Sequence, residues 1–362
     1  MNIKSELRKE GIEVVSKLER NKVNLIAKDI SKRLTKSFPE QNINYYELFA
    51  KLSNLNMYIA NIPNGIAAKY FYKNNSIYFN SNYDLNNLGS VAIHECIHSL
   101  QAQVNSVNKL SRLGLCNFAD PKLSGMGINE AAVQYMAMKS VGAKMESVKY
   151  FEVDIPTISP NYYALECNLI RQMAYITGEY VLFNSTLYSN NSFEDKFIAL
   201  TNKETYEKIK YNINYIIYLE DTLNCIYSKL QSSNYISANY FKLMNKAEKI
   251  KANIRDLFII TQNRIFTSYF DNCFDSLYTD KSIENFRTLL YNYKDLIGVT
   301  DNYTFFNNYY ISKMTDIERK YSNSKNNLAL LLPVKQTYFS ILIRKIKVLF
   351  GIKNNEYNTI YK

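Results

Sequence analysis

The sequence predicts a mostly α-helical protein with a small β-sheet, in which a front domain is followed by a helical bundle. From about residue 193 to residue 296 the apolar spacing is nearly all helical, with almost no Gly or Pro. Only one segment, around residues 69–79, has the aromatic-rich pattern that is typical of strands. The 362 residues, of which 47% are apolar and 21% charged, suffice for one large folded domain or two ordinary ones.

The charge and the cysteines narrow the classes of function. A net charge of +11 would suit nucleic acid or an anionic membrane, but the basic residues are spread along the whole chain. The sequence holds no zinc knuckle, Gly-rich phosphate loop or RNA-binding signature, so we expect no nucleic-acid partner. Five cysteines without a CxxC pair indicate free thiols in a reducing compartment. The charged N-terminal segment and the lack of an apolar stretch of about 18 residues lead us to expect a cytoplasmic protein.

The first part of the chain is expected to begin with helices. Residues 5–37 predict one or two charged amphipathic helices, because apolar residues recur at helical spacing. These residues are Val14, Val15, Leu18, Val23, Ile26 and Ile30. Pro39 ends this region, a second helix is predicted over residues 45–55, and Pro63 with Gly65 predicts a turn. The aromatic runs 69–72 and 76–79 then predict a β-hairpin, the only convincing β segment of the sequence.

Helices separated by Gly and Pro residues are predicted for the rest of the chain. Their ranges are about 84–104, 129–140, 161–187 and most of 193–296. The Asn- and Ser-rich residues 189–192 suggest a domain boundary. We therefore expect a first domain over residues 1–190, a helical domain over residues 191–325 and a separate C-terminal segment over residues 326–362.

The segment 91–100 contains the pattern HExxH, formed by His94, Glu95 and His98. Residues four apart on a helix project from one face, so the two imidazoles can bind a single tetrahedral zinc ion. Glu95 is rotated by about 100° from His94 around the helix, which brings a carboxylate beside the metal without making it a ligand. The chain has no other histidine, and the spacing of this pair around a Glu favours a zinc site over coincidence.

A catalytic zinc ion has three protein ligands and an open position for water. Because the chain has no third histidine, the third ligand must be a carboxylate or a thiolate. Glu130 is the best candidate, since Asn129 is a good N-cap that would place Glu130 in the first turn of a helix. Gly125 and Gly127 allow the preceding loop to turn sharply.

In these residues the chain resembles the gluzincin group of zincin metallopeptidases. In that group HExxH supplies two ligands, and a Glu on a later helix, often after Asn and before Gly or Ala, supplies the third. The resemblance covers roughly residues 65–140. It implies a zincin-like catalytic domain with zinc held by His94, His98 and Glu130, and with Glu95 as the general base that activates water. It also implies an endopeptidase whose peptide or protein substrate lies along the hairpin at residues 70–79.

The chain departs from the gluzincin pattern at two places. Thermolysin-like members carry an Asp four residues after the ligand Glu, where this chain has Gln134, so the group that supports a zinc-bound His must differ or lie elsewhere. The downstream His that stabilises the oxyanion in such enzymes is also absent. A Tyr is expected to take its place, and the candidates are Tyr135, Tyr162 and Tyr163.

The C-terminal segment predicts a basic amphipathic helix. No acidic residue occurs between Arg319 and Asn355, and the polar and apolar side chains of residues 336–350 fall on opposite helical faces. The apolar face would either dock on the helical bundle or lie on an anionic membrane. Two further functions are compatible with the sequence: a non-catalytic zinc-bearing binding or regulatory protein, and a membrane-surface protein in which the HExxH helix is incidental. The oligomeric state is left open.

Overall fold

The computed structural model describes residues 3–63, 65–106, 109–118, 125–231, 238–277, 279–300 and 305–328. These residues are mostly helical and include three small sheets, which confirms the predicted mostly α class. The chain forms two compact units, residues 1–307 and residues 308–362. A division near residue 190 stays a prediction, and the amphipathic helix expected around residues 336–350 lies outside the described residues.

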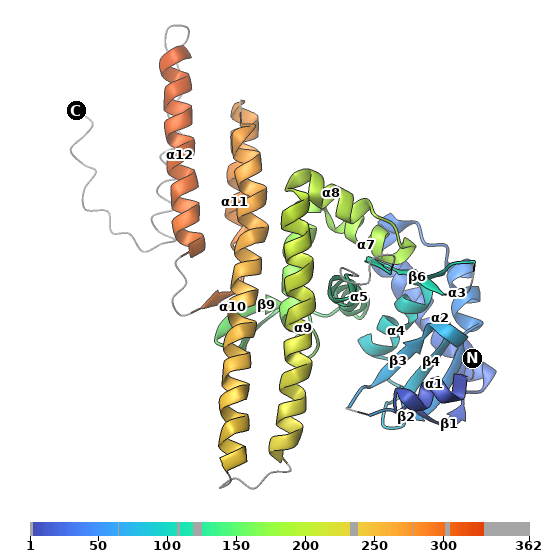
Figure 1. Cartoon of the computed structure of the whole chain (residues 1–362). Coiled ribbons are helices and arrows are strands. Elements are labelled where there is room, and N and C mark those ends of the chain that lie inside the picture. The colour runs from blue at the N-terminus through green and yellow to red at the C-terminus, as the bar shows by residue number, and fades with distance from the viewer. Residues whose placement is uncertain are drawn as a thin grey trace. The chain divides into compact units, whose positions relative to one another are not determined.

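The largest sheet lies in the first third of the chain and has the strand order β1-β2-β4-β3 (Figure 1). Its strands are β1 (Glu13–Lys17), β2 (Asn56–Asn61), β3 (Ala68–Phe71) and β4 (Ser76–Asn80). β2 and β4 are parallel, and the two outer strands run antiparallel to their neighbours. The predicted hairpin is confirmed, since β3 and β4 pair around the 3-10 turn η2 (Tyr72–Asn74). β3 is therefore an edge strand of this sheet.

The prediction of one or two amphipathic helices over residues 5–37 is wrong only in the middle of this region, where a strand separates two helices. The region divides into α1 (Ile3–Lys9), strand β1 and α2 (Arg20–Ser37). α2 buries its predicted apolar face, but Val14 and Val15 are 43% and 58% exposed and belong to the strand. β1 forms because it pairs with β2, which lies about forty residues further along the chain. The helical spacing of apolar residues within residues 5–37 gives no information about a partner strand elsewhere in the chain.

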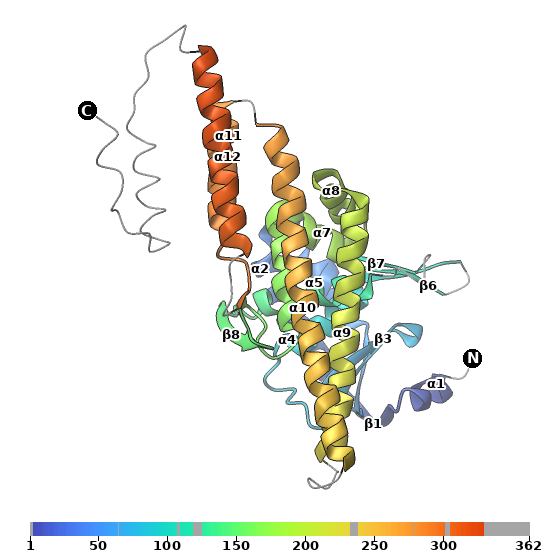
Figure 2. The ribbon, with the colours of Figure 1, turned by 60° about the vertical axis from the view of Figure 1, so that its left-hand side comes forward.

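The hairpin is also not the only β structure. A second sheet holds β5 (Ala102–Val104), β6 (Leu110–Leu113) and β7 (Cys116–Asn117), which extend away from the nearby helices in Figure 2. A third sheet holds β8 (Glu146–Tyr150), β9 (Val153–Thr157) and β10 (Val299–Thr300). The helix expected over residues 84–104 is accordingly shorter: α4 spans Ser90–Gln101 and is followed at once by β5. These strands are only two to five residues long, which leaves little pattern to recognise in the sequence.

Helices make up most of the remaining described chain. A short helix, α3 (Tyr45–Ser53), agrees with its prediction. The helix expected over residues 161–187 is interrupted at Gly178, whose φ of 94° divides it into α6 (Ala164–Thr177) and α7 (Glu179–Tyr188). The others are α5 (Met126–Ser140), α8 (Ser192–Leu200), α9 (Lys203–Gln231), α10 (Ala238–Asp275), α11 (Asp280–Tyr293) and α12 (Phe305–Leu328). α9 and α10 lie side by side and antiparallel (Figures 1 and 2), and α6 packs against α5, α10 and β9.

A buried carboxyl pair joins α6 to α9. Glu166 in the first turn of α6 is 0% exposed, and its carboxyl group lies within hydrogen-bond reach of that of Glu220 on α9. Among the described residues, no side chain other than Glu220 is a hydrogen-bond partner of the Glu166 carboxyl group. Two carboxylates cannot hydrogen-bond each other, so this contact requires one shared proton. Burial, the largest cause, raises the pKa of Glu166 to about 7, and it raises the pKa of Glu220 as well.

We expect Glu166→Gln to flatten the pH dependence of stability. The pKa of Glu166 rises from its ordinary 4.5 to about 7 in the folded chain, which therefore keeps a proton that the unfolded chain releases between those pH values. The free energy of unfolding of the wild type accordingly falls as the pH rises through this window. Besides Glu220, the groups facing this carboxyl are Asp221 on α9 and the phenols of Tyr150 and Tyr163.

Urea unfolding at about pH 5 and about pH 8 measures the effect, with exposed Glu204→Gln on α9 as the matched control. A Glu166→Gln protein that loses as much stability between the two pH values as the wild type does would contradict the shared proton.

Candidate metal centre

Helix α4 carries both histidines on one buried face. Ile93, Cys96 and Ile97 are each 0% exposed and anchor the helix in the core. His94 and His98 lie one turn apart, are buried, and have their Nε2 atoms 3.0 Å apart. The predicted pairing of the two imidazoles is therefore present in the fold.

Helix α5 brings Glu130 to these histidines, although not in the predicted way. The helix begins at Met126, after Gly125 with a φ of 76°, so Glu130 lies in the second turn rather than the first. Asn129 is not the N-cap: it is buried, and its Oδ1 accepts hydrogen bonds from the Leu115 N–H and the Gln101 side chain. Gly127 serves a close approach to α9, because a Cβ there would lie 2.7 Å from the Asn214 Oδ1.

The three side chains converge on one point. One potential ligand atom from each of His94, His98 and Glu130 lies within 4.8 Å of the other two. Glu130 Oε2 is 3.1 Å from His94 Nε2, and its Oε1 is 3.4 Å from His98 Nε2. Ligand atoms about 2.0–2.1 Å from a tetrahedral metal are about 3.3 Å apart, so this arrangement has the dimensions of a metal site.

Two buried glutamines fix the direction of the imidazoles. Gln134 Oε1 lies 2.9 Å from His94 Nδ1, and Gln101 Oε1 lies 3.0 Å from His98 Nδ1. The amide nitrogens are engaged elsewhere, that of Gln134 with Ser159 Oγ and that of Gln101 with the Thr186 carbonyl. Each amide therefore turns its oxygen to a histidine. Gln134 thus supports His94, and Gln101 supports His98 in a role that the sequence did not predict.

This orientation leaves the cluster in need of a positive charge. An amide oxygen only accepts hydrogen bonds, so both histidines carry a proton on Nδ1. In their neutral forms the two Nε2 lone pairs then face each other and the Glu130 carboxylate. Three electron-pair donors at 3.0–3.4 Å repel one another unless a cation lies among them. The donor set therefore fits a metal ion.

The pKa values of Glu130 and His98 also indicate that a positive charge stabilises this cluster. Burial alone would raise the pKa of Glu130, but the two imidazoles hold it far below its ordinary value. Burial alone would lower the pKa of His98, but the Glu130 carboxylate outweighs burial and raises it to about 9. Without a metal the cluster thus keeps a proton on His98, and a metal ion that binds there must displace it.

Glu95 lies beside the cluster and contacts the sheet. It is half-buried, and its Oε2 accepts a hydrogen bond of 2.5 Å from the Tyr70 N–H on edge strand β3. Burial, the largest cause, raises the pKa of this carboxyl, and the neighbouring imidazoles oppose the shift. One carboxylate oxygen is thereby held by the strand, while the side chain remains close to His94, His98 and Glu130.

Of the three tyrosine candidates, the structure brings Tyr163 to the cluster. Its ring stacks on His94 with a centroid distance of 6.3 Å, and Glu130 and Glu95 both contribute to raising its pKa, after burial. Its φ of 53° is rare for a bulky residue and marks a constrained backbone. Tyr135 points elsewhere, donating its hydroxyl to Glu179, and Tyr162 is 52% exposed.

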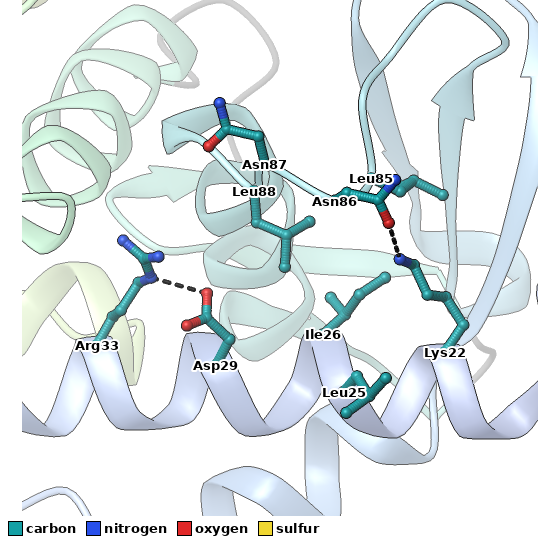
Figure 3. A pocket seen from close by; sticks show the side chains of 9 residues that line it. All are labelled: Lys22, Leu25, Ile26, Asp29, Arg33, Leu85, Asn86, Asn87 and Leu88. Atoms are coloured by element: carbon teal, nitrogen blue, oxygen red, sulfur yellow. Dashed lines mark hydrogen bonds and ion pairs between the residues drawn. The ribbon is translucent and has the colours of Figure 1, made fainter.

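A surface pocket of about 300 Å³ lies between α2 and the segment that leads into α4 (Figure 3). One polar contact crosses it, from Lys22 Nζ to Asn86 Oδ1, while Arg33 pairs with Asp29 along α2 itself. None of the residues of the metal cluster lines this pocket. The pocket is thus separate from the cluster.

Comparison with known proteins assigns no family. No protein-family model matches the chain, and searches of curated proteins and of solved structures found no match. Among the described residues, no helix is both long and apolar enough to cross a membrane. The function must therefore be argued from the metal cluster and its surroundings.

Gln134→Leu is expected to weaken metal binding by about 10- to 100-fold, the usual cost of removing the group that orients a ligand histidine. Leu fills a similar volume but accepts no hydrogen bond from His94, and it leaves Ser159 without its amide partner. Titration against a chromophoric zinc chelator measures the affinity. Gln134→Glu keeps an acceptor and is the matched control; equal affinity in Gln134→Leu and wild type would show that the amide orients nothing.

Proposed function

We propose that this chain is a zinc-dependent metallopeptidase that hydrolyses internal peptide bonds. The observation that carries the proposal is the convergence of His94, His98 and Glu130, with Glu95 from the same helix beside them. Two imidazoles and a carboxylate are a donor set of catalytic zinc sites, which keep a further position open for water. The presence of a carboxylate that ligates nothing favours catalysis over simple metal storage.

Zinc is the metal that these donors favour. Borderline nitrogen ligands from histidine combined with one carboxylate suit zinc better than calcium or magnesium, which prefer oxygen ligands. His94 and His98 would bind through Nε2, because their Nδ1 atoms face glutamine oxygens. Zinc in this position would supply Lewis-acid activation of both a water molecule and the scissile carbonyl.

Glu95 would carry out the proton transfers, and Tyr163 would stabilise the negative charge that develops during the reaction. Glu95 would accept a proton from the attacking water and deliver it to the leaving amine, and its raised pKa suits both halves of this exchange. The Tyr70 N–H would keep the Glu95 carboxylate oriented. The hydroxyl of half-buried Tyr163, whose pKa is raised by the nearby Glu130 and Glu95, would donate to the oxygen that gains negative charge as water attacks.

Strand β3 is the element that would align the substrate. Backbone groups on an edge strand can pair with an extended peptide, which fixes its position without reading its side chains. All four residues of β3 lie opposite residues of β4, and the Tyr70 N–H donates to Glu95. Because strand residues alternate, the backbone groups of Ala68 and Tyr70 face the side on which Glu95 lies. A peptide that paired with the Tyr70 carbonyl and the Ala68 backbone, and left the Tyr70 N–H to Glu95, would pass beside the metal cluster.

The test is digestion of a mixed peptide pool by zinc-loaded protein, followed by mass spectrometry of new peptide ends. The proposal predicts internal cleavage that stops on chelation and returns with zinc. A protein that binds zinc but cleaves no peptide in the pool would favour instead the non-catalytic zinc-bearing protein.

A further inference from the structure

The surface pocket of about 300 Å³ follows one face of α2 (Figure 3). Four of its lining residues recur on that helix at intervals of three and four, which places their side chains on the same face; they are Lys22, Ile26, Asp29 and Arg33. From the first of these residues to the last, the helix rises by about 16 Å. Residues 85–88 form the opposite wall. The pocket is therefore elongated, and its volume is at the lower end of the range of small-molecule sites.

The middle of the pocket is apolar. Ile26 is buried and forms its floor, and the side chain of Leu88 points toward α2 from the opposite wall (Figure 3). Leu25 and Leu85 add further apolar surface, and Leu25 is 64% exposed. An aliphatic group in this part of the pocket would remove apolar surface of both walls from water, which favours its binding.

The charged side chains of the pocket are not equally neutralised. Arg33 Nε donates to Asp29 Oδ2 at 2.7 Å, so these two charges balance each other. Lys22 Nζ instead donates at 2.8 Å to the amide oxygen of Asn86, which carries no charge, and no ion pair of Lys22 is formed within the described part of the chain. An ammonium group has three N–H bonds, so Lys22 can bind a further acceptor. Because the Lys22 side chain is half-buried, solvent screens its charge less than that of a fully exposed lysine.

These features together select the chemistry of a ligand. No other charged residue lines the pocket, so the lining has one excess positive charge, at its Lys22 end. A single carboxylate would neutralise this charge, whereas a cationic ligand would be repelled. Inorganic phosphate has no apolar part that could use the surface of Ile26 and Leu88. A ligand with one carboxylate and a compact hydrocarbon body matches both the charge and the apolar middle.

We propose that this pocket binds a small aliphatic carboxylate, with the carboxylate on Lys22 and the hydrocarbon body against Ile26 and Leu88. Residues 85–88 lead directly into α4, which begins at Ser90. The bound acid would therefore connect α2 to the segment from which the helix with both histidines starts. The proposal does not depend on the peptidase function, because the pocket is separate from the metal cluster.

Calorimetric titration of the full-length protein with 4-methylpentanoate tests the proposal. The reference ligand is 4-methylpentanamide, which has the same shape but no charge. We expect the acid to bind about tenfold more tightly than the amide, the usual order of effect of a hydrogen bond between charged groups. Lys22→Met keeps an unbranched side chain but removes the ammonium group, so the acid should lose this advantage while the affinity for the amide stays the same.

Two further variants locate the site. Lys28→Met removes an exposed lysine of α2 that does not line the pocket, and this matched control should keep the tenfold preference for the acid. Leu88→Ala removes an apolar wall, so it should weaken the binding of acid and amide by the same factor. A Leu88→Ala protein that binds both ligands as tightly as wild type would overturn the placement of the hydrocarbon body.

Three results would overturn the carboxylate site itself. The first is equal affinity of the acid and the amide, or no detectable binding of the acid. The second is an equal loss of acid binding in Lys22→Met and Lys28→Met, which would show general attraction of anions to a basic protein. The third is binding of inorganic phosphate as tight as that of the acid, which would show that the hydrocarbon body contributes nothing.

Discussion

Exchange of Glu95 for Gln is expected to leave zinc in place and to lower peptide hydrolysis by about 10²- to 10⁴-fold, the usual contribution of a general base. The substitution keeps the shape of the side chain and a carbonyl oxygen that can still accept from the Tyr70 N–H. It removes only the ability to take a proton from water. Loss should therefore fall on kcat rather than on KM, because binding of the peptide along β3 does not depend on that proton.

Steady-state cleavage of one peptide identified in the mixed pool measures this effect, with zinc content determined on the same samples. The matched control is Glu10→Gln. The Glu10 carboxylate pairs with Lys69, the neighbour of Tyr70 on β3, and is not part of the metal cluster. Turnover by Glu95→Gln at the wild-type rate would reject Glu95 as the base. Loss of zinc together with activity would mean that Glu95 is itself required to hold the metal.

Exchange of Glu130 for Gln is expected to weaken zinc binding by more than about 100-fold, since loss of a ligand should exceed loss of an orienting group. The variant also removes the carboxylate that raises the pKa of His98 to about 9. Two imidazoles alone leave the site short of a ligand and of the negative charge that balances the metal. Chelator competition measures the affinity, and Glu95→Gln is the matched control because it removes the neighbouring carboxylate. Equal zinc affinity in Glu130→Gln and wild type would remove Glu130 from the site.

The sequence predicted the residues of the cluster well because their chemistry is local. His94 and His98 lie on one helix, and a four-residue spacing suffices to place their imidazoles together. Glu130 was found because few other groups could complete the site, although the reason given for its position was wrong. Asn129 looks like an N-cap, but it is drawn into the core by Gln101 and the Leu115 N–H.

The sequence did not predict groups whose role depends on contacts between distant segments. Gln101 orients His98 only because its amide nitrogen donates to the Thr186 carbonyl on α7 and to Asn129 Oδ1 on α5. Tyr163 could not be separated from Tyr135 and Tyr162, because the choice depends on which ring reaches His94 in the folded chain. β1 was mistaken for helix for the same reason, since its partner strand is far away in the sequence.

The buried carboxyl pair was invisible in the sequence. Glu166 and Glu220 look like ordinary exposed acids on charged helices, and they are more than fifty residues apart. Only the folded chain buries Glu166 and brings its carboxyl group to that of Glu220.

The central claim is that His94, His98 and Glu130 hold a zinc ion, and elemental analysis of the purified full-length chain tests it most directly. The protein is loaded with zinc, freed of excess metal and compared with His98→Ala treated in parallel. The account predicts about one zinc ion per chain in wild type and almost none in the variant. No zinc in wild type after loading, or equal zinc in both proteins, would contradict it.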